Sequence, residues 1–357
     1  YEIVQGDWSS DVCSSDLPRL TPAIADVRRA VRESWMRNGV VSGDRVLVAC
    51  SGGADSLALA AAAIFEGARA GIWVGAVIVE HGLQPETKRV AEETAKTLTE
   101  LGASPVEVRA VKVSAAKTAG GPEAAARAAR YAAIDAFADE VDSKFVMLAH
   151  TLNDQAETVL LGLARGSGNR SLNAMAEVNG RYLRPLLGIE RATTVAFCVG
   201  SGLTAWQDPQ NSDGKFARVR ARHNVLPVLE AELGPGIAQA LARTAEQLRE
   251  DEVVLSQLAQ DFFNEFVSLK ATSIEIALRE FETAPLAIRH RVVAIALAVL
   301  KAPEFARVHI RAIDALVDDW HGQKPLTLPG VRVERTARHI VLKTAKTLKP
   351  GEIGRAH

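Results

Sequence analysis

Short apolar runs alternate regularly with helical stretches up to residue 164, and this pattern restricts the possible folds. The apolar runs have the length of buried strands and lie at 45–50, 72–79, 105–113 and 145–149. Apolar residues at helical spacing mark the segments 22–38, 56–68, 86–101, 122–138 and 154–164. This alternation predicts an α/β fold with a doubly wound parallel sheet, in which ligands bind at the carboxyl ends of the strands.

The pattern changes at about residue 224. A long amphipathic stretch at 238–266 and two helical segments at 285–300 and 307–320 come first. Three short strand-like segments follow, at 325–328, 331–334 and 339–342. We therefore expect a first domain over 18–223, a helical linker over 224–250 and a smaller α+β C-terminal domain over 251–345.

The two ends of the chain do not continue these patterns. Residues 11–17 and 352–357 can be back-translated as reverse complements of each other, like a sequencing adapter translated at both ends. We expect residues 1–17 and 352–357 to be non-native tails, and a genuine polar tail is the alternative. Without their acidic excess, the formal net charge would rise from −1 to about +3.

Composition indicates an ordinary soluble protein, with 48% hydrophobic and 24% charged residues. No apolar run reaches the roughly 18 residues that a membrane span needs, and no secretory leader is visible. Cys13, Cys50 and Cys198 are far apart and form no CxxC pair, which argues against a disulfide framework and a zinc site. We expect a cytoplasmic protein with reduced thiols.

The first predicted strand runs directly into the loop Ser51-Gly52-Gly53-Ala54-Asp55-Ser56, and a helix follows. Glycines let the backbone approach an anion, and the amides of the loop and of the helix N-terminus point at it. The serine hydroxyls are further donors, and Asp55 can cap the helix or hold a metal. The pattern predicts a phosphate-binding loop, and a plain serine–glycine turn is the alternative. The Walker and GxGxxG motifs are absent.

This loop resembles the PP-loop of the N-type ATP pyrophosphatases, which cleave ATP to AMP and pyrophosphate. A second motif resembles the tRNA(Ile)-lysidine synthetases of that superfamily; it reads His150-Thr151-Leu152-Asn153-Asp154-Gln155-Ala156-Glu157 and is followed by Arg165-Gly166-Ser167-Gly168. Further matches cover residues 45–250 and include Glu123, Arg127, Arg130, Tyr131, Arg184, Trp206, Asp208 and the basic stretch at 218–223. Three positions depart from the family pattern: Glu80 replaces the usual Asp, Asn153 an acid and Val219 an Asn.

The resemblance implies a ligase that adenylates the wobble cytidine of the isoleucine tRNA with anticodon CAU and joins free lysine to carbon 2. It implies ATP and Mg²⁺ as cofactors, and a homodimer is possible. It makes Asp55, His150, Asp154 and Glu157 catalytic candidates, with Asp55 and Asp154 also as metal ligands. The loop residues Ser51, Gly52, Gly53, Ala54, Asp55 and Ser56, together with His81, would bind ATP. The C-terminal domain over 251–345 would bind tRNA. In the first domain, the tRNA-binding candidates are Arg165, Arg170, Arg184, Arg218, Arg220 and Arg222.

Plainer alternatives remain open for several of these residues. His150 could be a hydrogen-bonded histidine at a strand end, and Glu157 could only cap or orient. The basic stretch has an arginine at every second position, Arg218, Arg220 and Arg222. In an extended segment these side chains would share one face, which could bind RNA or phosphate or could simply be solvated. Trp206 could stack on a base or pack. Other functions are another tRNA-modifying PP-loop enzyme, although thiolation by cysteine pairs lacks its CxxC, or a non-catalytic nucleotide- or RNA-binding protein.

Overall fold

The structure is a computed structural model, and it describes residues 20–80, 85–111, 121–166, 169–209, 213–302 and 305–344. The two predicted non-native tails and His81 lie outside these ranges. The chain divides into two compact units, one up to Glu246 and one from Gln247.

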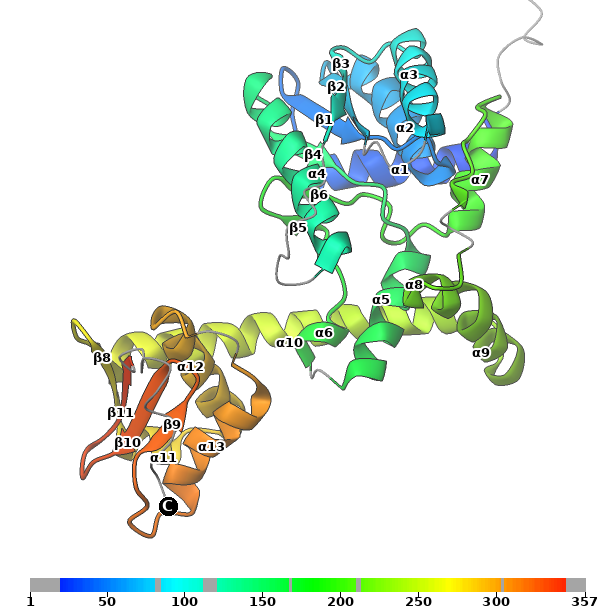
Figure 1. The fold of residues 1–357 in the computed structure, drawn as a ribbon. Coiled ribbons are helices and arrows are strands. Elements are labelled where there is room, and N and C mark those ends of the chain that lie inside the picture. The colour runs from blue at the N-terminus through cyan, green and yellow to red at the C-terminus, as the bar shows by residue number, and fades with distance from the viewer. Residues whose placement is uncertain are drawn as a thin grey trace, which may run out of the picture. The chain divides into compact units, whose positions relative to one another are not determined.

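The first unit is built on a six-stranded sheet with the order β3-β2-β1-β4-β6-β5 (Figure 1). Its strands are β1 (Arg45–Ala49), β2 (Trp73–Glu80), β3 (Val106–Ala110), β4 (Phe145–Met147), β5 (Val178–Asn179) and β6 (Tyr182–Leu183). Every neighbouring pair is parallel except β5 and β6 at the edge. The predicted doubly wound parallel sheet is confirmed.

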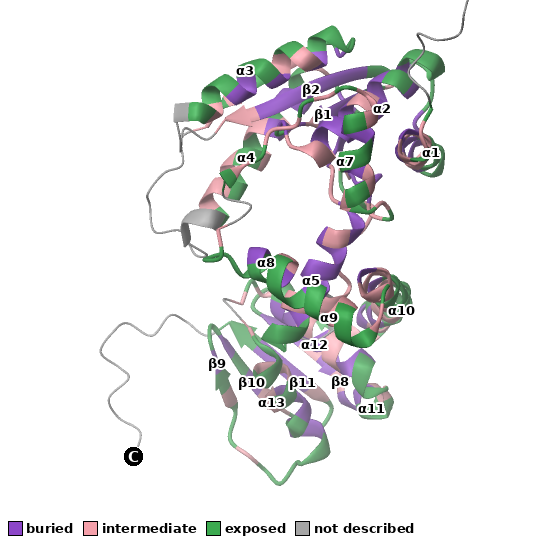
Figure 2. Ribbon diagram, turned by 90° about the vertical axis from the view of Figure 1, so that its right-hand side faces the viewer, coloured by how far each residue is buried: buried purple, intermediate pink, exposed green. Residues whose placement is uncertain are grey.

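Helices cover both faces of this sheet. They are α1 (Pro22–Arg37), α2 (Ala54–Ala70), α3 (Pro85–Glu100), α4 (Gly121–Glu140) and α7 (Arg191–Gly200). Because successive side chains of a strand point to opposite faces, β1 contributes to two cores. Val46 and Val48 join the core with α1, α2, α3 and α7, whereas Leu47 joins Phe137 of α4 on the other face. The strands β1 and β2 are accordingly mostly buried (purple in Figure 2).

The remaining elements of the first unit are helical. They are α5 (Leu152–Arg165), α6 (Asn169–Leu172), α8 (Ala217–Arg220), a π-helical turn η2 (Ala221–Val225), α9 (Leu226–Leu233) and the start of α10 (Ile237–Phe266). Residues 218–222 are therefore helical, so the shared face that an extended segment would give the three arginines does not form. Val219, Ala221 and Leu226 are buried there, and helical spacing lets this segment pack against α5.

The second unit has an antiparallel sheet with the order β7-β8-β11-β10-β9. Its strands are β7 (Val267–Leu269), β8 (Ser273–Ala277), β9 (Leu326–Leu328), β10 (Val331–Arg335) and β11 (His339–Thr344). The end of α10 and the helices α11 (Leu278–Thr283), α12 (Leu286–Val299) and α13 (Arg307–Asp318) share one core with this sheet. The predicted smaller α+β domain is confirmed. Among the described residues, no helix is long and apolar enough to cross a membrane.

Candidate active site

Strand order places two polar loops of the first unit beside each other. β1 and β4 are hydrogen-bonded neighbours although two strands separate them in the sequence, and the pair is parallel. Their carboxyl ends therefore lie at the same edge of the sheet, where doubly wound folds bind ligands. The loop at 51–56 leaves β1 at this edge, and His150 and α5 follow β4 at the same edge.

The loop at 51–56 is held in shape by one of its own side chains. The Ser56 hydroxyl donates to the Gly53 carbonyl at 2.9 Å and accepts the Ser51 amide at 3.1 Å. Gly52 has a φ of +83°, which favours glycine, and its carbonyl accepts the Trp206 amide at 2.9 Å. The predicted phosphate-binding residues are therefore brought together in an ordered loop that opens α2. The backbone amide of Trp206 supports this loop, and this contact does not depend on the position of the indole ring.

The acids of the second motif lie on the first turns of α5. Thr151 caps this helix, and its amide and hydroxyl donate to Asp154 Oδ2 at 2.8 and 2.9 Å. Burial alone would raise the pKa of Asp154, but the Arg191 charge and the Thr151 hydrogen bonds outweigh it, so the pKa is lowered. Glu157, one turn further, is fully buried. We call Asp55, Asp154 and Glu157 the carboxylate cluster.

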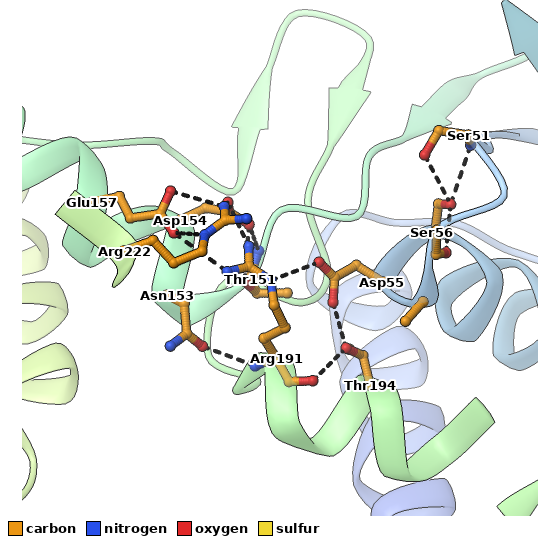
Figure 3. A network of polar contacts seen from close by, with 12 residues as sticks. Ser51, Asp55, Ser56, Thr151, Asn153, Asp154, Glu157, Arg191, Thr194 and Arg222 are labelled. Carbon is orange, nitrogen blue, oxygen red and sulfur yellow. Dashed lines mark hydrogen bonds and ion pairs between the residues drawn. The ribbon is translucent and has the colours of Figure 1, made fainter. Parts of the chain in front are cut away.

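One arginine that the sequence motifs did not indicate joins all three acids (Figure 3). Arg191 Nε lies 3.1 Å from Asp55 Oδ2, Nη2 2.9 Å from Asp154 Oδ1, and Nη1 3.3 Å from Glu157 Oε1. Burial acts to lower the pKa of Arg191, but the three carboxylates prevail and raise it. The cluster thus connects the loop after β1 with α5 through a side chain of α7.

Asn153 and Thr194 complete this connection. Asn153 Oδ1 accepts the backbone amide of Arg191 at 2.8 Å, one of the amides at the start of α7 that lack a partner within the helix. The Thr194 hydroxyl, one turn into α7, donates to Asp55 Oδ1. Asn153, where the family pattern has an acid, thus holds the start of a second helix through its side-chain oxygen, a bond that a carboxylate oxygen could equally accept.

Two arginines of the basic stretch reach the same acids. Arg222 Nε lies 2.6 Å from Glu157 Oε1 and its Nη2 lies 3.1 Å from Oε2, while Arg218 Nε lies 3.6 Å from Oε2. They are four residues apart and share a helical face, as an i, i+4 pair does. Arg220 instead donates to the carbonyls of Gly214 and Lys215. The three arginines therefore do not share one face.

The other predicted residues lie in different surroundings. Burial, the largest effect, lowers the pKa of His150 to about 4, so its imidazole is neutral at pH 7. Its Nδ1 is buried and finds no hydrogen-bond partner among the described residues. Arg184 is buried and donates to the Ala176 carbonyl at 2.9 Å. Arg165 is exposed at the end of α5, and the side chain of Arg170 lies outside the described part.

Comparisons with known proteins agree with this architecture. Residues 25–229 match the PP-loop domain family, and residues 277–340 match the TilS substrate binding domain. A tRNA(Ile)-lysidine synthase of Leifsonia xyli is 54% identical over 82% of this chain and 88% of its own length. One of Thermobifida fusca is 48% identical over 89% of this chain and 96% of its own length.

A solved structure, the U34-tRNA thiolase of Methanococcus maripaludis, has a TM-score of 0.53 at 18% identity. It covers 64% of this chain and 79% of its own, and it shares the fold. The two domain matches and the identity to full-length relatives make this chain a member of the tRNA(Ile)-lysidine synthase family.

Proposed function

We propose that this chain forms lysidine, by ATP-dependent ligation of lysine to carbon 2 of the wobble cytidine in the isoleucine tRNA with anticodon CAU. The observation that carries the proposal is the carboxylate cluster. It brings an acid of the phosphate-binding loop, Asp55, into one ion-pair network with the α5 acids Asp154 and Glu157. A reaction that uses ATP and a cationic amine needs a phosphate-binding loop and carboxylates side by side.

The loop at 51–56 has the features of an ATP phosphate site. It opens α2, so the first amides of this helix and the helix dipole favour an anion. Gly53 has an ordinary φ, and the nearest atom to a Cβ built on it is the Ser51 hydroxyl oxygen at 3.7 Å. The loop therefore presents backbone and hydroxyl groups without a bulky side chain at its tip.

Carboxylate oxygens are ligands that Mg²⁺ prefers, and Asp55 and Asp154 supply them beside this loop. The donor chemistry fits, although both acids are bonded to Arg191 in this structure. Asp55 and Asp154 would hold the ion, and Mg²⁺ would neutralise charge on the pyrophosphate leaving group. Among the described residues, no group of three or more His, Cys, Asp or Glu side chains is arranged as a metal site.

The proposed reaction has two displacements. Oxygen 2 of the cytidine attacks the α-phosphate of ATP, the bond to pyrophosphate breaks, and an adenylated tRNA forms. The ε-ammonium of lysine first loses a proton to solvent. The resulting uncharged amine attacks carbon 2, AMP leaves with the oxygen, and the attached nitrogen loses a second proton. Within this scheme the acids of the cluster would orient the lysine amine. His150, neutral at pH 7, is a hydrogen-bonding partner for the base or the phosphate and not a cationic one.

Binding of tRNA would involve both units. The second unit contains the segment that matches the TilS substrate binding domain, and exposed basic residues lie on it at Arg307, Arg311, Arg332 and Arg338. In the first unit, Arg165 and Arg220 are exposed, and Arg170 stays a candidate. Arg218 and Arg222 are engaged by Glu157, and Arg184 is buried, so we give these three a smaller share of the RNA contacts.

Thiolation is a weaker candidate despite the shared fold with a thiolase. Burial raises the pKa of both described thiols, Cys50 and Cys198, the latter to about 11. Both therefore stay protonated at pH 7, which disfavours thiolate chemistry and iron–sulfur ligation.

The test is incorporation of radiolabelled lysine into a transcript of isoleucine tRNA with anticodon CAU. Label should enter the tRNA only with ATP and Mg²⁺, and AMP and pyrophosphate should appear in equal amounts. Methionine tRNA has the same anticodon, so this control tests whether the reaction also requires the rest of the isoleucine tRNA. ATP and tRNA binding without incorporation would instead support a non-catalytic RNA-binding protein.

A further inference from the structure

Arg191 occupies the centre of the carboxylate cluster. Its three guanidinium nitrogens each contact a different acid, at 2.9 to 3.3 Å. Among the described ion pairs, it is the one side chain that touches Asp55, Asp154 and Glu157 together (Figure 3). Arg218 and Arg222, the other cations at the cluster, are bound to the acids of α5.

Each carboxylate oxygen of the cluster already accepts a bond from the chain. The two oxygens of Asp55 accept from Arg191 and Thr194, and those of Asp154 accept from Arg191 and Thr151. Both oxygens of Glu157 accept from Arg222. Three acids face three arginines, so the cluster is formally neutral. A cationic ligand thus meets neither a free oxygen nor a net negative charge until an arginine leaves.

Of the three arginines, Arg191 is the one whose departure would open Asp55 and Asp154. Its departure would free Asp55 Oδ2, weaken the hold on Asp154 and give the cluster a net charge of −1, whereas Glu157 would keep its paired bonds to Arg222. The Arg191 side chain is 24% exposed, so it has a path to solvent. Its backbone would stay in place through Asn153, and Thr194 would keep Asp55 oriented.

We propose that Arg191 is the resident cation of the carboxylate cluster and competes with cationic ligands for the same oxygens. Two cations fit this chemistry, a divalent ion such as Mg²⁺ and the ε-ammonium of lysine. The identity of these two cations rests on the proposed function, but the competition itself rests on the geometry of the cluster. Arg191 thereby sets how strongly the site binds a cation, and it excludes weak cations when no substrate is present.

The experiment is calorimetric titration of the full chain, with MgCl₂ and with L-lysine in separate runs. Arg191→Gln should tighten binding of the true competitor by about tenfold or more, if Arg191 leaves the cluster in no more than about one molecule in ten. L-norleucine, which lacks the ε-amine, should not bind more tightly. Arg181→Gln is the matched control, because Arg181 is 32% exposed and pairs with Asp139 at 2.6 Å. Arg181 precedes β6 and so lies at the amino ends of the parallel strands, away from the cluster at their carboxyl ends. It should leave both affinities unchanged.

Tightening for lysine alone or for Mg²⁺ alone supports the proposal and identifies the competitor. Equal or weaker binding of both cations by folded Arg191→Gln overturns it, because Arg191 would then position the acids and not occupy their site. If that variant does not fold, Arg191→Lys takes its place. The lysine variant keeps the charge but cannot span three carboxylates. It should tighten cation binding less than Arg191→Gln does, and cation binding no tighter than in the parent overturns the proposal. Because no tRNA is present, failure of lysine transfer would reject the proposed function without affecting this result.

Discussion

At the scale of single residues, Glu157 is the acid whose loss should disturb the protein most. It has no solvent exposure, and Arg191, Arg218 and Arg222 all contact its carboxylate. Glu157→Ala would leave these arginines partly buried without their partner. The expected cost is about 3–5 kcal/mol of unfolding free energy, measured by urea denaturation. Glu157→Gln keeps the shape and one acceptor oxygen for the arginines, so it should cost less than alanine. An alanine variant as stable as the parent would mean that solvent screens these ion pairs.

His150 gives a prediction in the acid range. Its folded pKa of about 4 lies below the ordinary value of 6.5 because burial disfavours the charged ring. Between these values the unfolded chain binds a proton that the folded chain does not. Stability should therefore fall by roughly 3 kcal/mol in total as the pH drops from about 6.5 to about 4. His150→Gln should remove this part of the pH dependence in urea unfolding at pH 5 and 7. If the stability of both proteins falls equally between pH 7 and pH 5, other groups cause the pH dependence.

Asp55 should matter for chemistry more than for stability. Its side chain is 24% exposed, and it stands at the start of α2 beside the proposed phosphates. Asp55→Ala should abolish ATP–pyrophosphate exchange at saturating tRNA, because an acid that holds Mg²⁺ acts on the charge that develops in the transition state. Its circular dichroism spectrum should stay that of the parent. Normal exchange in the folded variant would remove Asp55 from the site.

The family motifs made Asp55, His150, Asp154 and Glu157 candidates, but they did not point to Arg191. The partners of Arg191 lie 34, 37 and 136 residues away in the sequence. Only the neighbouring positions of β1 and β4 bring them together, and no local spacing reveals that. The same reason hides the role of Asn153, whose amide caps a helix that begins 38 residues later.

At the scale of elements, the apolar pattern of the sequence predicted helices and strands where buried residues recur with the period of the element. It missed the elements that lack such a period. The alternation up to residue 164 predicted β1 to β4 and the helices between them, because β1, β2 and β4 are mostly buried and even the half-exposed outer strand β3 is apolar enough to show. α7 was not predicted; its Thr193, Thr194 and Val195 are β-branched and locally disfavour a helix. Packing of Thr194, Phe197 and Cys198 in the core overrides that preference. The strands β5, β6 and β7 have two or three residues each, too few for a period to show, and β8 was missed although it is as long as β1.

The two glycines of the phosphate-binding loop should respond differently to the same substitution. Gly52 has a φ of +83°, and a Cβ there would lie 2.6 Å from Thr94 Oγ1, whereas Gly53 has room. Gly52→Ala should destabilise the protein by about 1–3 kcal/mol through backbone strain and this clash. Gly53→Ala should cost less and mainly weaken ATP binding. Adding Thr94→Ala to Gly52→Ala should recover part of the loss in thermal unfolding. No recovery would assign the loss to the backbone alone.

At the scale of the whole molecule, the proposed chemistry and the second unit are separable. The acids, Arg191 and the phosphate-binding loop all belong to the first unit, and its hydrophobic cores contain no described residue beyond Glu246. The core of the second unit contains none before Gln247. Each unit can therefore keep its own packing when the other is absent, and the covalent link through α10 is the shared element.

A chain truncated after Glu246 should therefore fold and bind ATP within about threefold of the parent. Its affinity for isoleucine tRNA should fall, because the exposed arginines of the second unit are lost. Each lost phosphate contact should also reduce the slope of log affinity against log salt by roughly 0.7–0.9. Filter binding at several salt concentrations measures both quantities. If affinity and slope both persist, the RNA surface lies in the first unit, where Arg165, Arg170 and Arg220 become its candidates. If ATP binding is lost while the truncated chain stays folded, the second unit contributes to the nucleotide site.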